Sequence, residues 1–238
     1  MTKKIKFNRA TAAAGVTGYS PSPALRAIPK WYKSLPKFEN NHKLFNGEGI
    51  PNLTIKACPP FLDSMMSGYM LYTEVDMHVT LHTSPEGESG SSFEWRVGGD
   101  LISSHGKAQI DPEQVPKGFN NQPFKFISQW QIITPKGYSI MFTHPQNRAD
   151  LPFATLSGTV DTDGYRSVVH FPFFIREDFE GTIPAGTPIV QIHPFKRESW
   201  EMELGEADAK EMFGSKLKLN HKLMGGYKTQ WWSRKEYR

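Results

Sequence analysis

The sequence predicts a mainly β protein, built as one barrel-like or sandwich-like domain with a C-terminal helical extension. From residue 53 to residue 200, short β-branched and aromatic runs alternate with Gly, Pro, Asn and Asp, which is typical of strands joined by turns and not of a layered α/β fold. The clearest run places Val75, Met77, Val79 and Leu81 on one face. The polar face of the same run would carry Glu74, Asp76, His78 and Thr80.

Further strands are expected where apolar runs end at turn residues. The expected strands span 69–81, 92–97, 124–134, 138–143, 168–174 and 189–193. Tight reversals are expected at 134–137 and 184–187, where proline presets φ and glycine accepts a positive φ.

Two stretches are expected to be helical. Residues 59–68 form a short helix at most, opened by proline and closed by Gly68. Residues 206–224 are rich in helix formers, although Gly214 should kink or break that helix. The tail beyond it must dock on protein, because each of its large aromatic side chains can bury about 150–250 Å². These aromatic residues are Tyr227, Trp231, Trp232 and Tyr237.

Charge is distributed unevenly along the chain. Residues 1–37 hold eight basic and no acidic side chains, residues 38–205 have a net charge of −8, and residues 206–238 have a net charge of +4. Basic ends can bind an anionic surface or the acidic body of another copy, and a homo-oligomer is expected; the alternative is solvated tails that keep the protein soluble. Nucleic-acid binding is disfavoured, because the sequence has no run of five consecutive basic residues and no zinc-finger or recognition-helix spacing.

These patterns divide the chain into three expected parts. Residues 1–27 are expected to form a basic flexible arm, residues 28–204 the mainly β domain, and residues 205–238 a helical, aromatic-rich, basic extension. The Trp31-Tyr32 pair between prolines is expected to mark where order begins, because prolines stiffen the segment and aromatic side chains favour burial.

Composition excludes several classes of protein. With 38% hydrophobic and 13% aromatic residues, the chain is too apolar to be disordered, and no apolar run approaches the roughly 20 residues of a membrane span. A single cysteine, Cys58, excludes an internal disulfide and a Cys-rich zinc site, and is expected to be a buried thiol. The start, Met-Thr-Lys-Lys-Ile-Lys, lacks the apolar stretch of a secretory signal, so an intracellular protein is expected.

Polar residues that could carry chemistry concentrate between residues 138 and 200. His144, Arg148 and Asp150 fall in one expected loop, where Arg148 could hold a phosphate and Asp150 could orient it or accept a proton. The alternative is an Arg–Asp pair that only holds the loop together. Asp161 and Asp163 share a turn, where they could bind a cation, orient a water, or accept the backbone N–H groups of that turn.

Three histidines fall on or beside expected strands. His144, His170 and His193 could surround a metal ion in a cupin-like barrel, although no His-x-His pair supports that arrangement. The alternative is a hydrogen-bonded core histidine, above all for His170.

A series of short phrases between residue 28 and about residue 200 carries a family resemblance. The phrases include IPKWY (28–32), CPPFLD (58–63), PKGYS (135–139), DLPF (150–153) and PFKRE (194–198). With them the chain resembles an uncharacterised protein family met among tailed bacteriophages. The resemblance implies a phage origin and a place in the host cytoplasm, and supplies no chemistry.

Two phrases, GTVDTDGYR (158–166) and IPAGTPIVQ (183–191), carry a second, local resemblance. The first is similar to the Gly-x-Ile-Asp-x-Asp-Tyr-Arg-Gly motif of dUTP nucleotidohydrolases, and the second is similar to their Ile-x-x-Gly-x-x-Ile-x-Gln strand pair. The resemblance implies the β-clip fold, shared with dCTP deaminases. It also implies that Asp161 activates water, that Tyr165 packs against the base and sugar, and that Gln191 lies on the phosphate side. The chain departs from the motif at Gly164, which is inserted before Tyr165.

The sequence leaves three functional hypotheses and does not decide whether the protein is an enzyme. The first is a phage protein that binds, and can hydrolyse, a nucleotide or similar phosphorylated small molecule, with Asp161 as the catalytic residue and Mg²⁺ as a candidate cofactor. Its ligand-binding residues would be His144, Arg148, Asp150, Asp163, Tyr165 and Gln191. The second is a non-catalytic virion or assembly protein that self-associates through charged arms. The third is a cupin-like metal-dependent enzyme.

Overall fold

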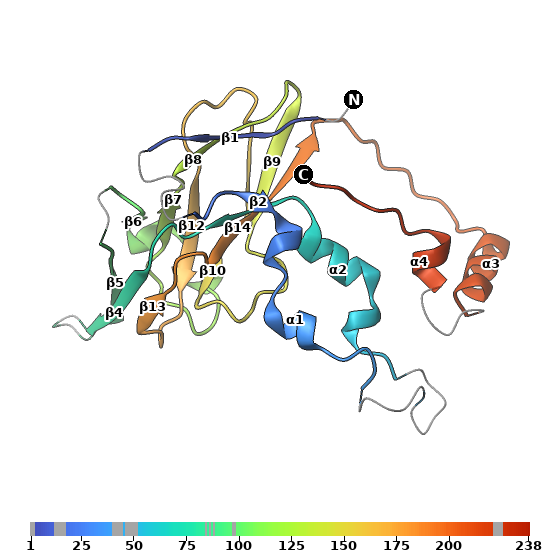
Figure 1. Cartoon of the computed structure of the whole chain (residues 1–238), viewed down its shortest axis with the longest axis horizontal. Coiled ribbons are helices and arrows are strands. Elements are labelled where there is room, and N and C mark those ends of the chain that lie inside the picture. Colours follow the sequence, from blue (N-terminus) through green and yellow to red (C-terminus); the bar gives the residue numbers. More distant parts are fainter. Residues whose placement is uncertain are drawn as a thin grey trace. The chain divides into compact units, whose positions relative to one another are not determined.

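The structure is a computed structural model, and it describes residues 3–11, 18–39, 45, 52–83, 85, 87, 89–96, 99–220 and 226–238. Within these residues the chain is mainly β, with several antiparallel sheets and helices near the C-terminus, as the sequence predicts (Figure 1). No helix in the described part of the chain is long and apolar enough to cross a membrane.

The chain forms two compact units. Unit 1 comprises Met1–Ala24 and Gly68–Arg197, and unit 2 comprises Leu25–Ser67 and Glu198–Arg238. Each of these units is made of two separate segments of the chain. The expected division into residues 1–27, 28–204 and 205–238 stays a prediction. One part of the expected N-terminal arm is ordered in a sheet: Lys6–Arg9 forms strand β1, which pairs with β8 (Trp130–Ile133).

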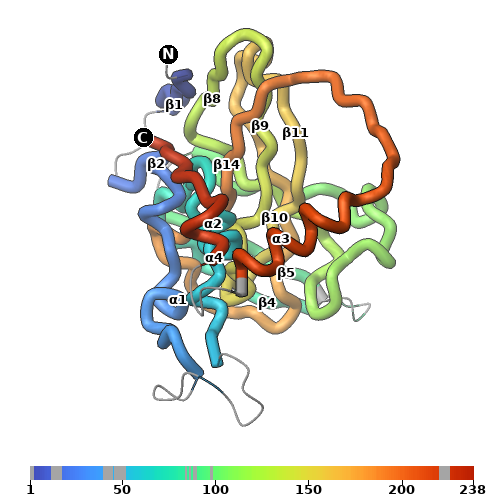
Figure 2. The backbone as a smooth tube through the Cα atoms, turned by 90° about the vertical axis from the view of Figure 1, so that its right-hand side faces the viewer, coloured from blue at the N-terminus to red at the C-terminus, as the bar shows by residue number. Residues whose placement is uncertain are grey.

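Unit 1 contains all the strands of the described chain, and every strand pair is antiparallel. The largest sheet has the order β11 (Gly158–Val160), β9 (Tyr138–Thr143), β14 (Pro188–Lys196), β3 (Tyr69–Tyr72), β2 (Ser22–Pro23). A second sheet has the order β10 (Phe153–Thr155), β12 (His170–Ile175), β7 (Phe124–Ile127), β6 (Ile102–Ser104). A third sheet has the order β13 (Gly181–Ile183), β4 (Met77–Thr83), β5 (Ser89–Glu94), and β1–β8 is the fourth. Figure 2 shows β9, β11 and β14 side by side.

The core of unit 1 is filled by aromatic side chains from the second sheet. The rings of Phe126 and Phe173 stack with centroids 3.8 Å apart, and Phe153 meets both rings edge-on. Offset and edge-on aromatic pairs stabilise a core beyond the area they bury. Isoleucine and valine side chains of β14 complete the cluster, which includes Ile189, Val190 and Ile192.

The alternation expected for residues 74–81 holds from Val75 onward, since Val75 packs against the core and Asp76 is exposed. Met77 and Val79 are buried and His78 is exposed, as predicted. Glu74, expected on the polar face, is instead buried at 4% exposure. The reason is that the chain bends after β3, so Glu74 does not continue the pleat of β4.

Unit 2 is built from short helices and the C-terminal tail. Its first segment contains α1 (Lys30–Ser34), the 3₁₀ turn η2 (Ile55–Ala57) and α2 (Pro59–Met66). Its second segment contains α3 (Ala209–Asn220) and α4 (Gly226–Gln230). The break expected at Gly214 is wrong: α3 runs continuously across it, because one glycine costs a helix only about 1 kcal/mol.

Aromatic residues of unit 2 pack on each other. Tyr32 is buried and stacks on Phe61, with ring centroids 6.0 Å apart, while Trp31 meets Phe61 edge-on. The docking expected for the tail is confirmed at two residues. The indole of Trp232 donates to Asp63 on α2 (2.8 Å), and the Tyr237 hydroxyl lies 3.2 Å from that of Ser67.

Candidate functional site

The structure places the seven site residues predicted from the sequence in two separate groups. Asp161, Asp163 and Tyr165 lie on the turn after β11, beside the start of β9. The other four lie around the far end of β9, in the loop that follows it and on β14: His144, Arg148, Asp150 and Gln191. Five residue steps along β9 separate the two ends, roughly 17 Å at about 3.4 Å per residue. The two groups therefore do not form one pocket within a chain.

The first group is a network around Arg197, a residue that the site prediction missed. Asp163 accepts hydrogen bonds from the Gly137 amide (2.7 Å) and from Arg197 Nη2 (2.5 Å). Asp161 Oδ1 accepts from the Ser139 hydroxyl (2.5 Å) and lies 3.2 Å from Arg197 Nη1. These contacts tie the turn after β11 to the start of β9 and the end of β14.

The contacts of Asp163 lower its pKa and leave its side chain nearly buried, whereas other members of the network are exposed. The hydrogen bond from Arg197 and that from the Gly137 amide lower the pKa of Asp163 to about 2. The Asp163 side chain is 12% exposed, whereas that of Asp161 is 68% exposed. Tyr165 is exposed as well, and its hydroxyl donates to the Val168 carbonyl (3.2 Å). Asp161, Tyr165 and Arg197, whose side chain is 39% exposed, are thus the members that a ligand could reach.

The second group holds its own loop together. His144 Nδ1 accepts from the Thr155 amide (3.2 Å), and the opposite ring nitrogen lies 3.0 Å from the Arg148 carbonyl, to which it can donate. Burial lowers the pKa of His144, which agrees with a neutral ring. Arg148 forms two hydrogen bonds to Asp150 (2.7 and 2.8 Å), and these lower the pKa of Asp150. The arrangement matches the alternative of an Arg–Asp pair that stabilises a loop.

Gln191 also has a structural role. Its side chain is fully buried, and Oε1 accepts from the Gln146 amide (3.0 Å) in the same loop. A buried amide N–H without a partner would be costly, so Gln191 stabilises the path of the loop over β14.

The described residues provide no metal site. No group of three or more His, Cys, Asp or Glu side chains within the described ranges is placed to hold a metal ion. His170 is exposed on β12, whereas His193 Nε2 lies 3.5 Å from the Thr143 hydroxyl on β9. The three-histidine arrangement expected of a cupin-like enzyme is therefore not formed. Asp161 and Asp163 do not fit Mg²⁺ either, since Arg197 already supplies the cation between them.

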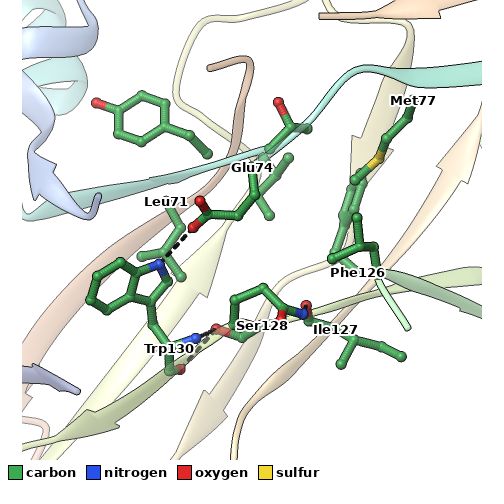
Figure 3. Close-up of a pocket in the computed structure, with 12 residues that line it drawn as sticks. Leu71, Glu74, Met77, Phe126, Ile127, Ser128 and Trp130 are labelled. Atoms are coloured by element: carbon green, nitrogen blue, oxygen red, sulfur yellow. Dashed lines mark hydrogen bonds between the residues drawn. The ribbon is translucent and has the colours of Figure 1, made fainter. Parts of the chain in front are cut away.

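Unit 1 has a small, mostly apolar cavity between the strands with a few buried polar groups, shown in Figure 3. Buried Glu74 accepts from the indole of Trp130 (2.8 Å), and the Ser128 hydroxyl both donates to and accepts from the Trp130 backbone. The cavity measures about 20 Å³, which is enough for a single water. It is too small to be a ligand site.

A cavity of small-molecule size lies in unit 2, where no site was predicted from the sequence. It measures about 290 Å³ and is lined by residues of both segments of the unit. The lining residues are Lys37, Lys56, Ala57, Cys58, Pro59, Leu62, Asp63, Met66, Lys228 and Trp232. We call it the lysine–tryptophan pocket. Cys58, expected to be fully buried, is half-buried and lines this pocket.

The wall of this pocket is held by hydrogen bonds. Asp63 accepts from Trp232 Nε1 (2.8 Å) and from Lys235 Nζ (2.6 Å), so the carboxylate is already countered by one ammonium group. Lys56 donates to the carbonyls of Tyr32 (2.6 Å) and Lys33 (3.0 Å) at the end of α1. Trp232 and Lys56 are thereby held at the pocket wall.

The pocket carries an excess of positive charge. With Asp63 paired to Lys235, the ammonium groups of Lys37, Lys56 and Lys228 remain around the cavity. In the described part of the chain, neither Lys37 nor Lys228 forms an ion pair; Lys228 Nζ lies 5.6 Å from the Trp232 ring centroid. A positively charged cavity with an aromatic wall can accept an anionic ligand that has a flat apolar part.

A second cavity, of about 280 Å³, shares Met66 and Trp232 with the first. Its other charged lining residues are engaged in ion pairs, Lys235 with Asp63 and both arginines with Glu236. Glu236 lies 2.5 Å from Arg238 and 3.6 Å from Arg234, so this cavity has less unpaired charge to offer a ligand.

The sequence reasoning missed the lysine–tryptophan pocket because its parts are far apart in the chain. Lys37 and Lys56 come from the first segment of unit 2, whereas Lys228 and Trp232 come from the C-terminal tail. The available signal is the basic, aromatic composition of both chain ends, which predicts charged arms and a docked tail but no pocket.

Comparisons with known proteins do not identify a family. No family model and no curated protein matches the sequence. Among solved structures, a mutant dUTPase from phage phi11 of S. aureus matches with a TM-score of 0.35 and 10% identity, covering 86% of this chain and 97% of that chain. A mutant dUTPase of Staphylococcus bacteriophage 80alpha with dUpNHpp matches with the same TM-score and identity, covering 87% and 91%. At these values the likeness carries no conclusion about activity, and membership of the phage family stays a prediction.

Proposed function

We propose that this protein binds a small phosphorylated molecule, with a nucleotide as the main candidate, in the lysine–tryptophan pocket. The observation that carries the proposal is the cavity of about 290 Å³ that three lysine side chains and one indole line together. Ammonium groups bind phosphate oxygens through charge-assisted hydrogen bonds, and an indole face can stack on a flat base.

Hydrolysis at Asp161 is the second candidate function. It is favoured by the 68% exposure of the Asp161 side chain next to the Ser139 hydroxyl and Arg197. In that reaction the carboxylate would accept a proton from a water whose oxygen bonds to phosphorus. The phosphoanhydride P–O bond would break, the departing phosphate would take the bonding electron pair, and Tyr165 would lie against the ligand. A phage origin and a place in the host cytoplasm belong to this proposal, and they rest on the sequence resemblances.

A thermal-shift screen tests both candidates. The purified protein is heated with ATP, dUTP or inorganic triphosphate, since a ligand that binds only the native state raises the melting temperature. Lys37→Met with Lys228→Met removes two charges from the pocket, and Asp161→Asn changes the second candidate site. The matched control is Lys117→Met with Lys136→Met, which removes two lysines of unit 1 that do not line the pocket.

The variants separate the two sites. We expect the wild type and the control to be stabilised by at least one nucleotide, and the double pocket variant to lose that shift. A rise in melting temperature that survives in the double pocket variant but disappears in Asp161→Asn would indicate that the ligand binds at the turn after β11. No shift with any of the three probes in the wild type would contradict ligand binding at both places.

A further inference from the structure

The segment that follows β14 exposes a row of large apolar side chains. Trp200, Met202 and Leu204 are 89%, 82% and 86% exposed. Within the described part of the chain, residues 199–207 form no helix or strand and make no backbone hydrogen bond to another residue. Exposed apolar residues that are clustered in this way mark interaction sites, because their burial is favourable. We call residues 198–208 the arm.

The arm has the pattern of a β-strand with two different faces. Its apolar side chains occur at every second position, and Glu201 and Glu203 stand between them. Successive side chains of an extended chain point to opposite faces, so one face of the arm would be apolar and the other acidic. Residues 198–208 contain five acidic side chains and no basic one.

Strand β1 and the two residues before it, Lys4 and Ile5, carry the complementary pattern. Ile5 and Phe7 are half-buried and pack against the core of unit 1, whereas Lys4 and Lys6 are exposed. Among the described strands, β1 pairs only with β8, so it is an edge strand. An edge strand presents backbone N–H and C=O groups to which another extended segment can add.

We propose that the arm of one copy of the protein adds as a strand to β1 of a second copy. Trp200, Met202 and Leu204 would then continue the apolar row of Ile5 and Phe7. Glu201 and Glu203 would face Lys4 and Lys6. A second copy is the partner because both elements, with opposite charges and the same two-residue period, occur in this chain.

Charge exchange between two variants tests the proposal. The arm variant carries Glu201→Lys and Glu203→Lys, and the strand variant carries Lys4→Glu and Lys6→Glu. The control variant carries Glu113→Lys and Glu180→Lys at exposed positions of unit 1 outside β1. It changes the net charge by the same amount as the arm variant. Sedimentation velocity at several protein concentrations measures the oligomeric state of each, and circular dichroism verifies that each is folded.

The expected result is association of the wild type and the control, and a monomer for each of the two variants alone. Mixing the arm and strand variants should restore association, because the reversed arm of one then faces the reversed strand of the other. Association of the wild type should also weaken as salt is added. A wild type that is monomeric at all concentrations, an arm variant that still associates, or a mixture that stays monomeric would overturn the proposal.

Discussion

At the scale of single residues, Arg197 decides what the two carboxylates of the turn after β11 can do. Its guanidinium group contacts both Asp161 and Asp163, and it also donates to the Ser139 hydroxyl (2.8 Å). A guanidinium group stays charged at all ordinary pH values, so it stabilises the ionised form of Asp163. Arg197 therefore joins three neighbouring strands at one end of the sheet, and of the two carboxylates only Asp161 is largely exposed to solvent.

The low pKa of Asp163 predicts how stability depends on pH. The pKa is 3.8 for a free aspartate and about 2 in the folded protein. A carboxyl group whose pKa is lowered by folding contributes stability above its unfolded pKa. That contribution is lost as the pH falls from about 3.8 to about 2.

We expect Asp163→Asn to have a lower melting temperature than the wild type at pH 7. Between about pH 3.8 and pH 2, its melting temperature should fall less steeply than that of the wild type. Asp161→Asn is the matched comparison and should change both quantities less, because its side chain is 68% exposed. Melting temperatures at a series of pH values measure the effect. An equal loss for the two variants at pH 7 would show that the Asp163 contacts are not the stabilising ones.

At the scale of elements, β14 is positioned by the close approach of its own backbone, at Ile192, to the backbone of Gly68. Gly68 precedes β3 with φ +74°, and a Cβ atom at this residue would lie 1.9 Å from the Ile192 carbonyl oxygen on β14. Only glycine can therefore stand where the chain enters β3. This contact explains why a glycine ends the segment that the sequence predicts as a short helix.

Gly68→Ala should be strongly destabilising. A left-handed backbone costs about 1–2 kcal/mol for a residue with a side chain, and a steric overlap adds about 1–3 kcal/mol. Gly118 is the matched control, since it has φ +81° but nothing within 4 Å of its would-be Cβ. Urea unfolding should therefore give a larger loss for Gly68→Ala than for Gly118→Ala, and equal losses would mean that β14 moves to accommodate the methyl group.

At the scale of the whole molecule, the apolar core and the proposed pocket belong to different units. The main hydrophobic cluster runs from Leu71 to Ile192, entirely within unit 1. The lysine–tryptophan pocket is lined only by unit 2. Removal of the tail should therefore affect ligand binding and leave the β core folded.

Deletion of residues 226–238 checks this expectation. The deletion removes Lys228 and Trp232 from the pocket, so we expect the shift in melting temperature with nucleotide to disappear. The far-UV circular dichroism of the strands and a cooperative thermal transition should remain. Loss of the cooperative transition would show that the core of unit 1 depends on the tail.

Much of the fold could be predicted because β-strands leave a local pattern in sequence. The alternation at Met77 and Val79 and the turn residues Pro135 and Gly137 identified strands and a turn that the structure contains. Prediction failed where local pattern and tertiary contact disagree. Glu74 is buried because the chain bends before β4, and Gly214 lies within α3.

The sequence by itself determined the mainly β class, the positions of most strands and the uneven charge, because these depend on neighbouring residues. Only the tertiary structure decided which polar residues meet. It joined Arg197 to Asp163 and separated His144 from both. It also placed Lys37 beside the same cavity as Trp232. Such contacts join residues that are far apart in the chain. Strand pairing and burial decide which residues meet, and a local sequence pattern contains no information about either.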